Sequence, residues 1–185
     1  MPHRQFPVND PERRKWLNPE KLLSDIGLVP GMTFVDVGSS DGYFSIPAAR
    51  IVGPTGKVIA IDIDEGAISR LRQHATDEGL SLLSAEVGSG EETVTCDGCA
   101  NFVFFGIDLH DFNDPAQAIR NAKRMLKPSG LLVDLDWKPE PTPFGPPLRR
   151  RFSIDKARQL IEAEGFSVKS VAEAGPYHYV IIAGI

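Results

Sequence analysis

Short apolar runs alternate with amphipathic segments along most of the chain. The runs are four to seven residues long and rich in β-branched residues, a pattern typical of buried strands. Seven strands are expected: Thr33 to Val37, Lys57 to Ile63, Ser81 to Ala85, Phe102 to Ile107, Leu131 to Leu135, Val168 to Val171 and Val180 to Ile185.

The amphipathic segments predict helices between these strands. Asn18 and Ser153 are suitable caps for the first and last helices, and Pro19 suits a first helical position. The expected helices run from Asn18 to Ile26, Tyr43 to Val52, Glu65 to Glu78, Pro115 to Leu126 and Ser153 to Glu164.

The order of strands and helices predicts an α/β fold with a mostly parallel sheet. Only a turn at Gly175 and Pro176 lies near the junction of the last two strands, which leaves no room for a crossover helix. These strands must therefore form a hairpin, with one strand antiparallel to the rest. We expect one domain over residues 1–185, with a core at 18–185 and a lid-like segment at 1–17.

The composition of the chain excludes some classes of function and partner. The chain has 185 residues, 42% hydrophobic and 24% charged, and a formal net charge of -5, which argues against nucleic acid or a membrane surface as a partner. The apolar runs are shorter than the roughly 20 residues that span a bilayer. Residues 1–9 lack the apolar core of a secretory signal, so we expect a cytoplasmic protein.

Two cysteines, Cys96 and Cys99, are too few to staple a domain of this size, which agrees with a reducing compartment. Their C-x-x-C spacing is half of a zinc site, and no second pair completes four ligands, so no metal is expected. A redox pair, or a soft-metalloid substrate, is the alternative left open.

The turn after the first strand, Gly38 to Gly42, is the predicted ligand site. Ligands of open α/β sheets bind at the carboxyl ends of the strands, and small residues let the backbone approach them. A nicotinamide dehydrogenase would need glycines at 38, 40 and 43, but Ser40 and Tyr43 stand at two of these positions. A purely structural turn is the other interpretation.

Asp62 ends the second strand, 24 positions after Gly38. An ionised carboxylate has two acceptor oxygens, so Asp62 suits both hydroxyls of a ribose. Its alternative role is to cap the helix that begins near Glu65.

The residues at this turn resemble motif I of the class I methyltransferases, with matches at Asp36, Gly38 and Gly42 and with Ser40 in the place of the middle glycine. The segment from Arg124 to Leu132 is similar to the "RxLKPGG" signature of the UbiE-like branch. The resemblance implies a Rossmann-like seven-stranded fold with helices on both faces, S-adenosylmethionine as cofactor, S-adenosylhomocysteine as product, and a homodimer as the assembly. The cofactor contacts that it implies are Asp36, Gly38, Ser39, Ser40, Gly42, Asp62, Ile63, Glu86, Val87 and Gly106.

Asp108 and His110 follow the fourth strand, where this family has its active-site segment. They are the candidate bases for a protonated acceptor. A structural histidine and a cofactor-binding aspartate are the alternatives. The absence of D-P-P-Y and N-P-P-Y from the sequence speaks against a DNA base, so the expected acceptor is a small molecule. A nicotinamide oxidoreductase and a non-catalytic cofactor-binding module are the rival functions.

Aromatic residues mark the expected substrate side. Trp137 and Phe144 suit an apolar pocket, Trp16 suits a packing anchor next to the lid, and Tyr177 to Tyr179 are expected to pack in the last hairpin. The basic cluster Arg149 to Arg151, with Lys156 and Arg158, is expected to be a solvated face.

Overall fold

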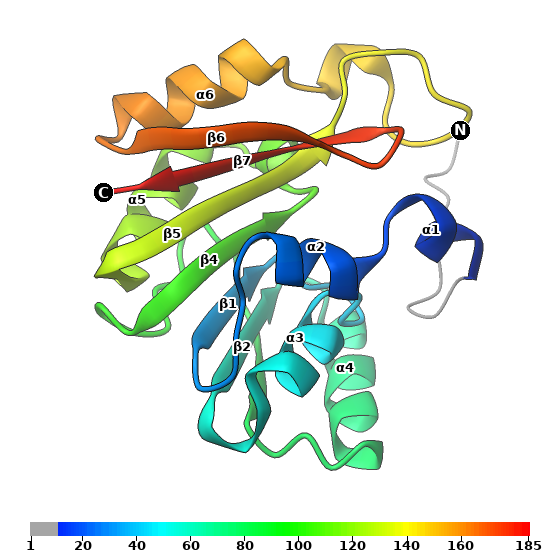
Figure 1. Cartoon of the computed structure of the whole chain (residues 1–185), viewed down its shortest axis with the longest axis vertical. Coiled ribbons are helices and arrows are strands. Elements are labelled where there is room, and N and C mark those ends of the chain that lie inside the picture. The colour runs from blue at the N-terminus through cyan, green and yellow to red at the C-terminus, as the bar shows by residue number, and fades with distance from the viewer. Residues whose placement is uncertain (1–10) are drawn as a thin grey trace.

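The computed structural model describes residues 11–185, which contain one seven-stranded sheet (Figure 1). The strand order is β3-β2-β1-β4-β5-β7-β6. The strands are β1 (Thr33–Val37), β2 (Lys57–Asp62), β3 (Leu83–Val87), β4 (Ala100–Gly106), β5 (Leu126–Trp137), β6 (Ser167–Ala174) and β7 (His178–Gly184).

The sheet confirms the predicted mixed topology. The pairs among β1 to β5 are parallel, whereas β7 pairs antiparallel with both β5 and β6. The short turn at Gly175 has a positive φ of 68° and reverses the chain between the two last strands. The carboxyl ends of β1, β2, β4 and β5 therefore meet along one edge of the sheet.

Helices cover both faces of the sheet, as expected (Figure 1). On one face, α5 and α6 pack on the largest apolar cluster, while α2, α3 and α4 contribute to the two clusters of the opposite face. The helices are α1 (Pro11–Trp16), α2 (Pro19–Asp25), α3 (Ser45–Val52), α4 (Glu65–Asp77), α5 (Pro115–Met125) and α6 (Ile154–Ala163).

Side-chain caps fix the starts of four helices. Asn18 and Ser153 cap α2 and α6, which confirms both predicted caps. Asp114 accepts from the backbone of α5, and Asp64 accepts from the N–H groups of Gly66 and Ala67 at the start of α4. Because Asp64 caps α4, the alternative role of Asp62 as that cap was wrong.

Some predicted boundaries were displaced. The third strand begins at Leu83 rather than Ser81, because residues 80–82 form the turn that follows α4. Glu86 and Val87 consequently lie inside β3 rather than after it. The fifth strand begins at Leu126, so the Lys-Pro-Ser-Gly segment belongs to β5 and is not a separate connection.

The segment between β3 and β4 lies against the α5 and α6 face of the sheet. Val94, Cys96 and Cys99 pack on the apolar cluster there. Cys96 and Cys99 form a disulfide with a Cα–Cα distance of 5.9 Å. The two cysteines are thus paired with each other across one short turn, and the disulfide does not link distant elements.

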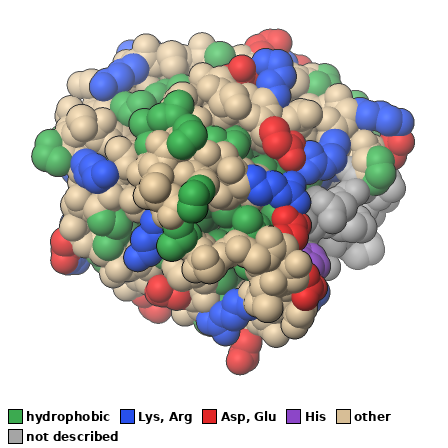
Figure 2. Space-filling model, turned by 60° about the horizontal axis from the view of Figure 1, so that its bottom comes forward, with side chains coloured by type: hydrophobic (Ala, Val, Ile, Leu, Met, Phe, Trp, Pro, Cys, Tyr) green, Lys and Arg blue, Asp and Glu red, His purple; other side chains and the backbone are tan. Residues whose placement is uncertain are grey.

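The surface carries charges of both signs. Figure 2 shows Lys and Arg side chains next to Asp and Glu side chains on one face of the molecule. Arg50 pairs with Glu78 at 2.6 Å and Arg70 with Asp41 at 2.8 Å, two of the ion pairs in the described part of the chain. None of the helices in residues 11–185 is long and apolar enough to cross a membrane.

Candidate functional site

A cavity of about 410 Å³ lies at the carboxyl ends of the strands, where the sequence predicted the ligand site. Its walls come from the ends of β1, β2, β4 and β5, from α1, and from the proline-rich loop after β5. The lining residues are Arg13, Trp16, Gly38, Ser40, Asp41, Asp62, Asp64, Arg70, Gly106, Ile107, Asp108, His110, Asp111, Trp137, Gly145 and Pro146.

The turn after β1 presents bare backbone to this cavity. Gly38 has a φ of +77°, and a Cβ built on it would lie 1.7 Å from Oδ2 of Asp108, so only glycine fits. Ser40 has a φ of +47°, the left-handed conformation that a glycine at this position adopts without strain. Ser40 and Ile107, with a φ of +76°, are the non-glycine residues with positive φ within residues 11–185, and both line the cavity.

Asp62 holds the turn in place and still faces the cavity. Its Oδ2 accepts the backbone N–H of Ser40 at 2.8 Å, and its Oδ1 accepts that of Asp64 at 2.8 Å. A carboxylate offers about four lone-pair positions, so Asp62 keeps acceptor capacity for a ligand.

Asp36 lies below the turn and is 1% exposed. The Ser45 hydroxyl donates to its Oδ2. The pKa of Asp36 is raised to about 7, chiefly by burial; the Ser45 hydrogen bond opposes this rise and the nearby Asp62 charge contributes to it. Asp36 supports the turn from beneath instead of lining the cavity.

Asp108 projects from the end of β4 toward the backbone of Gly38. Its Oδ2 is enclosed and has no hydrogen-bond partner among the residues that the structure describes. Burial raises the pKa of this carboxyl well above its usual range, and the charges of Asp62, Asp36, Asp111 and Asp136 raise it further. A positively charged ligand in the cavity would relieve this repulsion.

His110 forms a pair with a residue that the sequence did not single out. Its Nδ1 lies 2.8 Å from Oδ1 and 2.9 Å from Oδ2 of Asp136, which is fully buried on β5. The backbone N–H of Trp137 also donates to Asp136 at 2.7 Å. In the tautomer that donates its Nδ1 proton to Asp136, the lone pair of the imidazole lies on Nε2.

The Nε2 side of His110 is polar as well. Oδ1 of Asp111 lies 3.4 Å from Nε2, and Arg150 forms an ion pair with Asp111 at 2.7 Å. His110 therefore combines the two interpretations from the sequence: it is hydrogen-bonded within the fold, and it lines the cavity.

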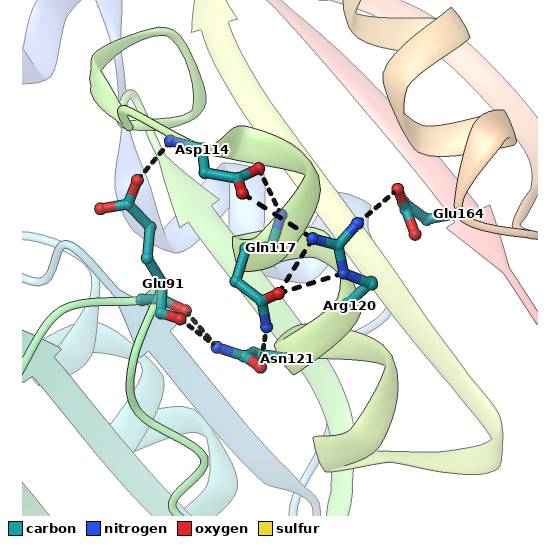
Figure 3. Close-up of polar contacts among 7 residues, drawn as sticks. Glu91, Asp114, Gln117, Arg120, Asn121 and Glu164 are labelled. Carbon is teal, nitrogen blue, oxygen red and sulfur yellow. Dashed lines mark hydrogen bonds and ion pairs between the residues drawn. The ribbon is translucent and has the colours of Figure 1, made fainter.

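The end of β3 lies outside the lining of this cavity. Glu86 is exposed, Val87 is 50% exposed and Ile63 is 75% exposed. A polar network attaches the loop after β3 to helix α5 (Figure 3). In it, Nδ2 of Asn121 donates to the backbone oxygens of Gly90 at 3.0 Å and Glu91 at 2.8 Å.

The rest of the network extends from α5. The Glu91 carboxylate accepts the backbone N–H of Asp114, and Gln117 donates to Asn121 at 2.9 Å. Arg120 contacts Gln117 and forms an ion pair with Glu164 at 3.0 Å (Figure 3). The network thus attaches the loop that follows Val87 to α5.

An aromatic cluster forms the opposite part of the cavity wall. The Trp16 ring lies 5.1 Å from Phe144, 5.7 Å from Tyr177, 6.2 Å from Trp137 and 5.5 Å from His178, centroid to centroid. Trp16 is thus a packing anchor, as predicted, and it also lines the cavity. His178 and Tyr179 are buried in β7, which confirms the expected hairpin packing.

The basic cluster corrects one expectation. Arg151 is 9% exposed rather than solvated, whereas Arg149 and Arg150 are exposed. The Arg151 guanidinium donates to the backbone oxygens of residues 138, 140, 144 and 146 and to the Thr142 hydroxyl, at 2.6–3.4 Å. Spacing along the sequence could not reveal this, because most of the acceptors are backbone carbonyls.

The predicted site residues separate into two groups. Six of them line the cavity: Gly38, Ser40, Asp62, Gly106, Asp108 and His110. The remaining six lie below or beside it: Asp36, Ser39, Gly42, Ile63, Glu86 and Val87. The sequence analysis missed Asp136, although two acids in the apolar run of β5 were a signal that could have found it.

Comparisons with known proteins agree with this geometry. Residues 28–142 match the model of a family described as a methyltransferase domain. The chain is 31% identical to Nocamycin O-methyltransferase of Saccharothrix syringae over 84% of this chain and 54% of the relative. It is 29% identical to demethylmenaquinone methyltransferase of Staphylococcus aureus over 63% of this chain and 48% of the relative. The chain thus spans about half the length of these curated relatives.

Solved structures match over more of their length. A SAM dependent methyltransferase from Aquifex aeolicus superposes with a TM-score of 0.89 and 29% identity, covering 97% of this chain and 98% of that one. A putative type 11 methyltransferase from Sulfolobus solfataricus superposes with a TM-score of 0.75 and 25% identity, covering 91% and 92%.

Proposed function

Because the chain belongs to the methyltransferase-domain family, we propose that it binds S-adenosylmethionine and transfers the methyl group to a small-molecule acceptor. The observation that carries the proposal is the placement of Asp62 beside the bare backbone of Gly38 in one cavity. There a carboxylate and free backbone meet at the carboxyl ends of adjacent strands, an arrangement that suits a nucleoside ligand.

The charge of the cavity also favours this cofactor. Its lining contains five aspartates. Asp41 pairs with Arg70 and Asp111 with Arg150, and burial favours the protonated form of Asp108. The carboxylates of Asp62 and Asp64 supply the remaining negative charge, against the guanidinium group of Arg13. S-adenosylmethionine carries a positive sulfonium, whereas NAD carries a negative pyrophosphate. Acidic surroundings therefore favour the sulfonium cofactor and disfavour the nicotinamide alternative.

The residues of the turn have separate proposed roles toward the cofactor. Asp62 accepts hydrogen bonds from the ribose hydroxyls, Gly38 and Ser40 line the approach, and Asp108 faces the positively charged part. Glu86 and Val87 at the end of β3, with Ile63 just after β2, lie beside the adenine ring of the cofactor. When bound, the cofactor supplies an electrophilic methyl group, so the protein mainly aligns the acceptor and excludes water.

His110 is the proposed general base. Asp136 holds Nδ1, and this leaves Nε2 able to accept a proton from the acceptor. Asp136 also stabilises the imidazolium that forms, because its carboxylate stays within hydrogen-bond distance of Nδ1. A protein that only binds the cofactor would need the turn from Gly38 to Gly42 but not a His–Asp pair. The His110–Asp136 pair therefore favours an enzyme over a non-catalytic module.

Calorimetric titration with S-adenosylmethionine, S-adenosylhomocysteine and NAD tests the proposal. We expect the first two ligands to bind and Asp62→Ala to weaken both by about 10- to 100-fold, since each hydrogen bond to a charged group contributes about 1.5–3 kcal/mol. Asp77→Ala, on the exposed side of α4, is the matched control and should leave binding unchanged. Binding of NAD alone would overturn the proposal.

A further inference from the structure

Helix α1 is a short element that depends on its neighbours for its position. It has six residues, Pro11–Trp16, and none of them is buried. Isolated helices shorter than about 12 residues are marginal in water, so contacts with the core must hold α1 in place. Arg13 and Trp16 are its residues that line the cavity. The position of α1 therefore determines one side of the cavity.

The first part of α1 is held by side chains of the core. Arg14 forms two hydrogen bonds with the Glu20 carboxylate, at 2.6 and 2.9 Å. The Arg13 guanidinium lies over the Tyr43 ring, 3.7 Å from its centroid, and the Tyr43 hydroxyl donates to the carbonyl of Leu17. These contacts come from α2 and from the segment before α3. The last residue of α1 is held by a different part of the fold.

The turn between β6 and β7 lies beside the end of α1 (Figure 1). The Trp16 ring stacks on the His178 ring at 5.5 Å and lies 5.7 Å from the Tyr177 ring, centroid to centroid. The Trp16 carbonyl lies against Gly175, so closely that a Cβ on Gly175 would be 2.0 Å from the carbonyl oxygen. Both the ring and the backbone of Trp16 therefore contact the same turn.

A side chain at position 175 would displace α1 rather than the turn. The turn is attached to the sheet, because the pairing of β7 with β5 and with β6 continues to His178. The backbone N–H of Lys138 also donates to the carbonyl of Tyr177 at 2.8 Å. Helix α1 has no strand pairing and no buried residue, so it is the partner that moves.

Gly175 lies outside the lining of the cavity, so its effect on a ligand must pass through α1. We propose that Gly175 is a positioning residue of the cofactor site: its missing side chain lets the turn receive the Trp16 carbonyl, which places Arg13 and Trp16 in the cavity wall. The inference rests on the proposed methyltransferase function, because its test uses S-adenosylhomocysteine as the ligand.

A second glycine in the same conformation provides a matched control. Gly79 has a φ of +67° and Gly175 a φ of +68°, so alanine meets the same left-handed backbone strain at both positions. A Cβ at position 79 would meet no atom of residues 11–185 within 4 Å, whereas at position 175 it meets the Trp16 carbonyl. A difference between the two variants therefore reports the contact with α1 and not the strain.

Calorimetric titration with S-adenosylhomocysteine measures the effect on the cavity. We expect Gly175→Ala to weaken binding about tenfold, because the displaced helix no longer brings Arg13 and Trp16 to the ligand. Gly79→Ala should bind within about twofold of the original protein, because Gly79 is not part of the cavity lining.

Limited trypsin digestion of the ligand-free protein reports on α1 itself. Trypsin binds its substrate in an extended conformation, so it cuts after Arg13, Arg14 and Lys15 only when α1 has opened, and a helix this short opens when its neighbours release it. We expect Gly175→Ala to speed cleavage at these bonds about tenfold, since the rate follows the population of the open form. Gly79→Ala should leave the rate unchanged. Mass spectrometry of the fragments identifies the bonds.

Tyr177→Ala keeps the proposal testable if Gly175→Ala does not fold. It removes one ring that contacts Trp16, at a half-buried position outside the cavity lining, and it leaves the backbone of the turn unchanged. We expect it to weaken S-adenosylhomocysteine about threefold and to speed cleavage in α1 by a similar factor.

The outcomes separate this inference from the proposed function. Weaker binding together with faster cleavage, absent from Gly79→Ala, supports the positioning role. Unchanged cleavage would show that the turn does not hold α1, faster cleavage with unchanged binding would show that α1 is not part of the ligand site, and equal effects of Gly175→Ala and Gly79→Ala would trace to strain alone. Each of these results overturns the inference while the methyltransferase proposal stands. If the original protein does not bind S-adenosylhomocysteine, the methyltransferase proposal fails, and the role of Gly175 in a cofactor site fails with it.

Discussion

Asp36 shows how one buried carboxyl can make stability depend on pH. Burial raises the pKa of Asp36 in the folded chain from its ordinary value of 3.8 to about 7. At pH 5 the carboxyl is therefore protonated in the folded chain and ionised in the unfolded chain. The folded state binds more protons, so stability falls as pH rises from 5 to about 7 and changes no further above that.

We expect this residue to account for up to about 3 kcal/mol of stability lost between pH 5 and pH 8. Urea unfolding at both pH values, for the original protein and Asp36→Asn, measures it. The asparagine does not titrate, so its loss between the two pH values should be smaller by that amount. An equal loss in both proteins would show that Asp36 titrates normally.

At the level of single residues, the sequence predicted those whose role follows from position along a strand. Gly38 and Asp62 were predicted because each stands where a strand ends, and both line the cavity. Asp136 was missed because it became important only when β4 and β5 paired and brought it to His110. Arg151 was misjudged, since nothing in a run of three arginines tells which one is buried.

Gly42, in the turn that follows β1, lies close against Leu71 of α4. Gly42 has a φ of +94°, and a Cβ built on it would lie 2.3 Å from Cδ1 of Leu71 on α4. Gly79, just after α4, has a similar φ of +67°, but there a Cβ would meet no atom of residues 11–185 within 4 Å. The two glycines therefore share the backbone requirement and differ in the space available.

We expect Gly79→Ala to destabilise the protein by about 1 kcal/mol, from left-handed backbone strain alone. Gly42→Ala should cost about 3 kcal/mol, because overpacking against Leu71 adds about 1–3 kcal/mol to the same strain. Urea unfolding of the two variants gives both values. Equal losses would mean that α4 moves aside without cost.

At the level of elements, the sequence predicted the order and type of the strands better than their ends. The hairpin of β6 and β7 was found because the turn at Gly175 is too short for a crossover. The start of β3 was wrong because Leu82 is apolar, yet it lies in the turn after α4 and is 40% exposed. Local hydrophobicity cannot tell a strand residue from an apolar residue in a turn.

Ligand binding should raise the stability of the whole fold, because the cavity exists only in the folded chain and a ligand that binds there shifts the equilibrium toward the folded state. At 100 times its dissociation constant, S-adenosylhomocysteine should stabilise the folded state by about 2.7 kcal/mol. For a chain of this length that is a rise in Tm of about 5–10 °C. Thermal unfolding with and without the ligand measures it, and NAD at equal concentration is the control, expected to leave Tm unchanged.

Arg151 holds the loop after β5 in a way that depends little on the amino-acid sequence of the loop. Four of the five groups that it binds are backbone oxygens, which every amino acid provides. The side chains at positions 139–141 and 143 can therefore be exchanged without removing the hydrogen bonds that shape the loop. A single arginine thus holds the backbone of the loop while the side chains on it can vary. Substitutions in the loop should therefore be able to change this side of the cavity without altering the turn from Gly38 to Gly42.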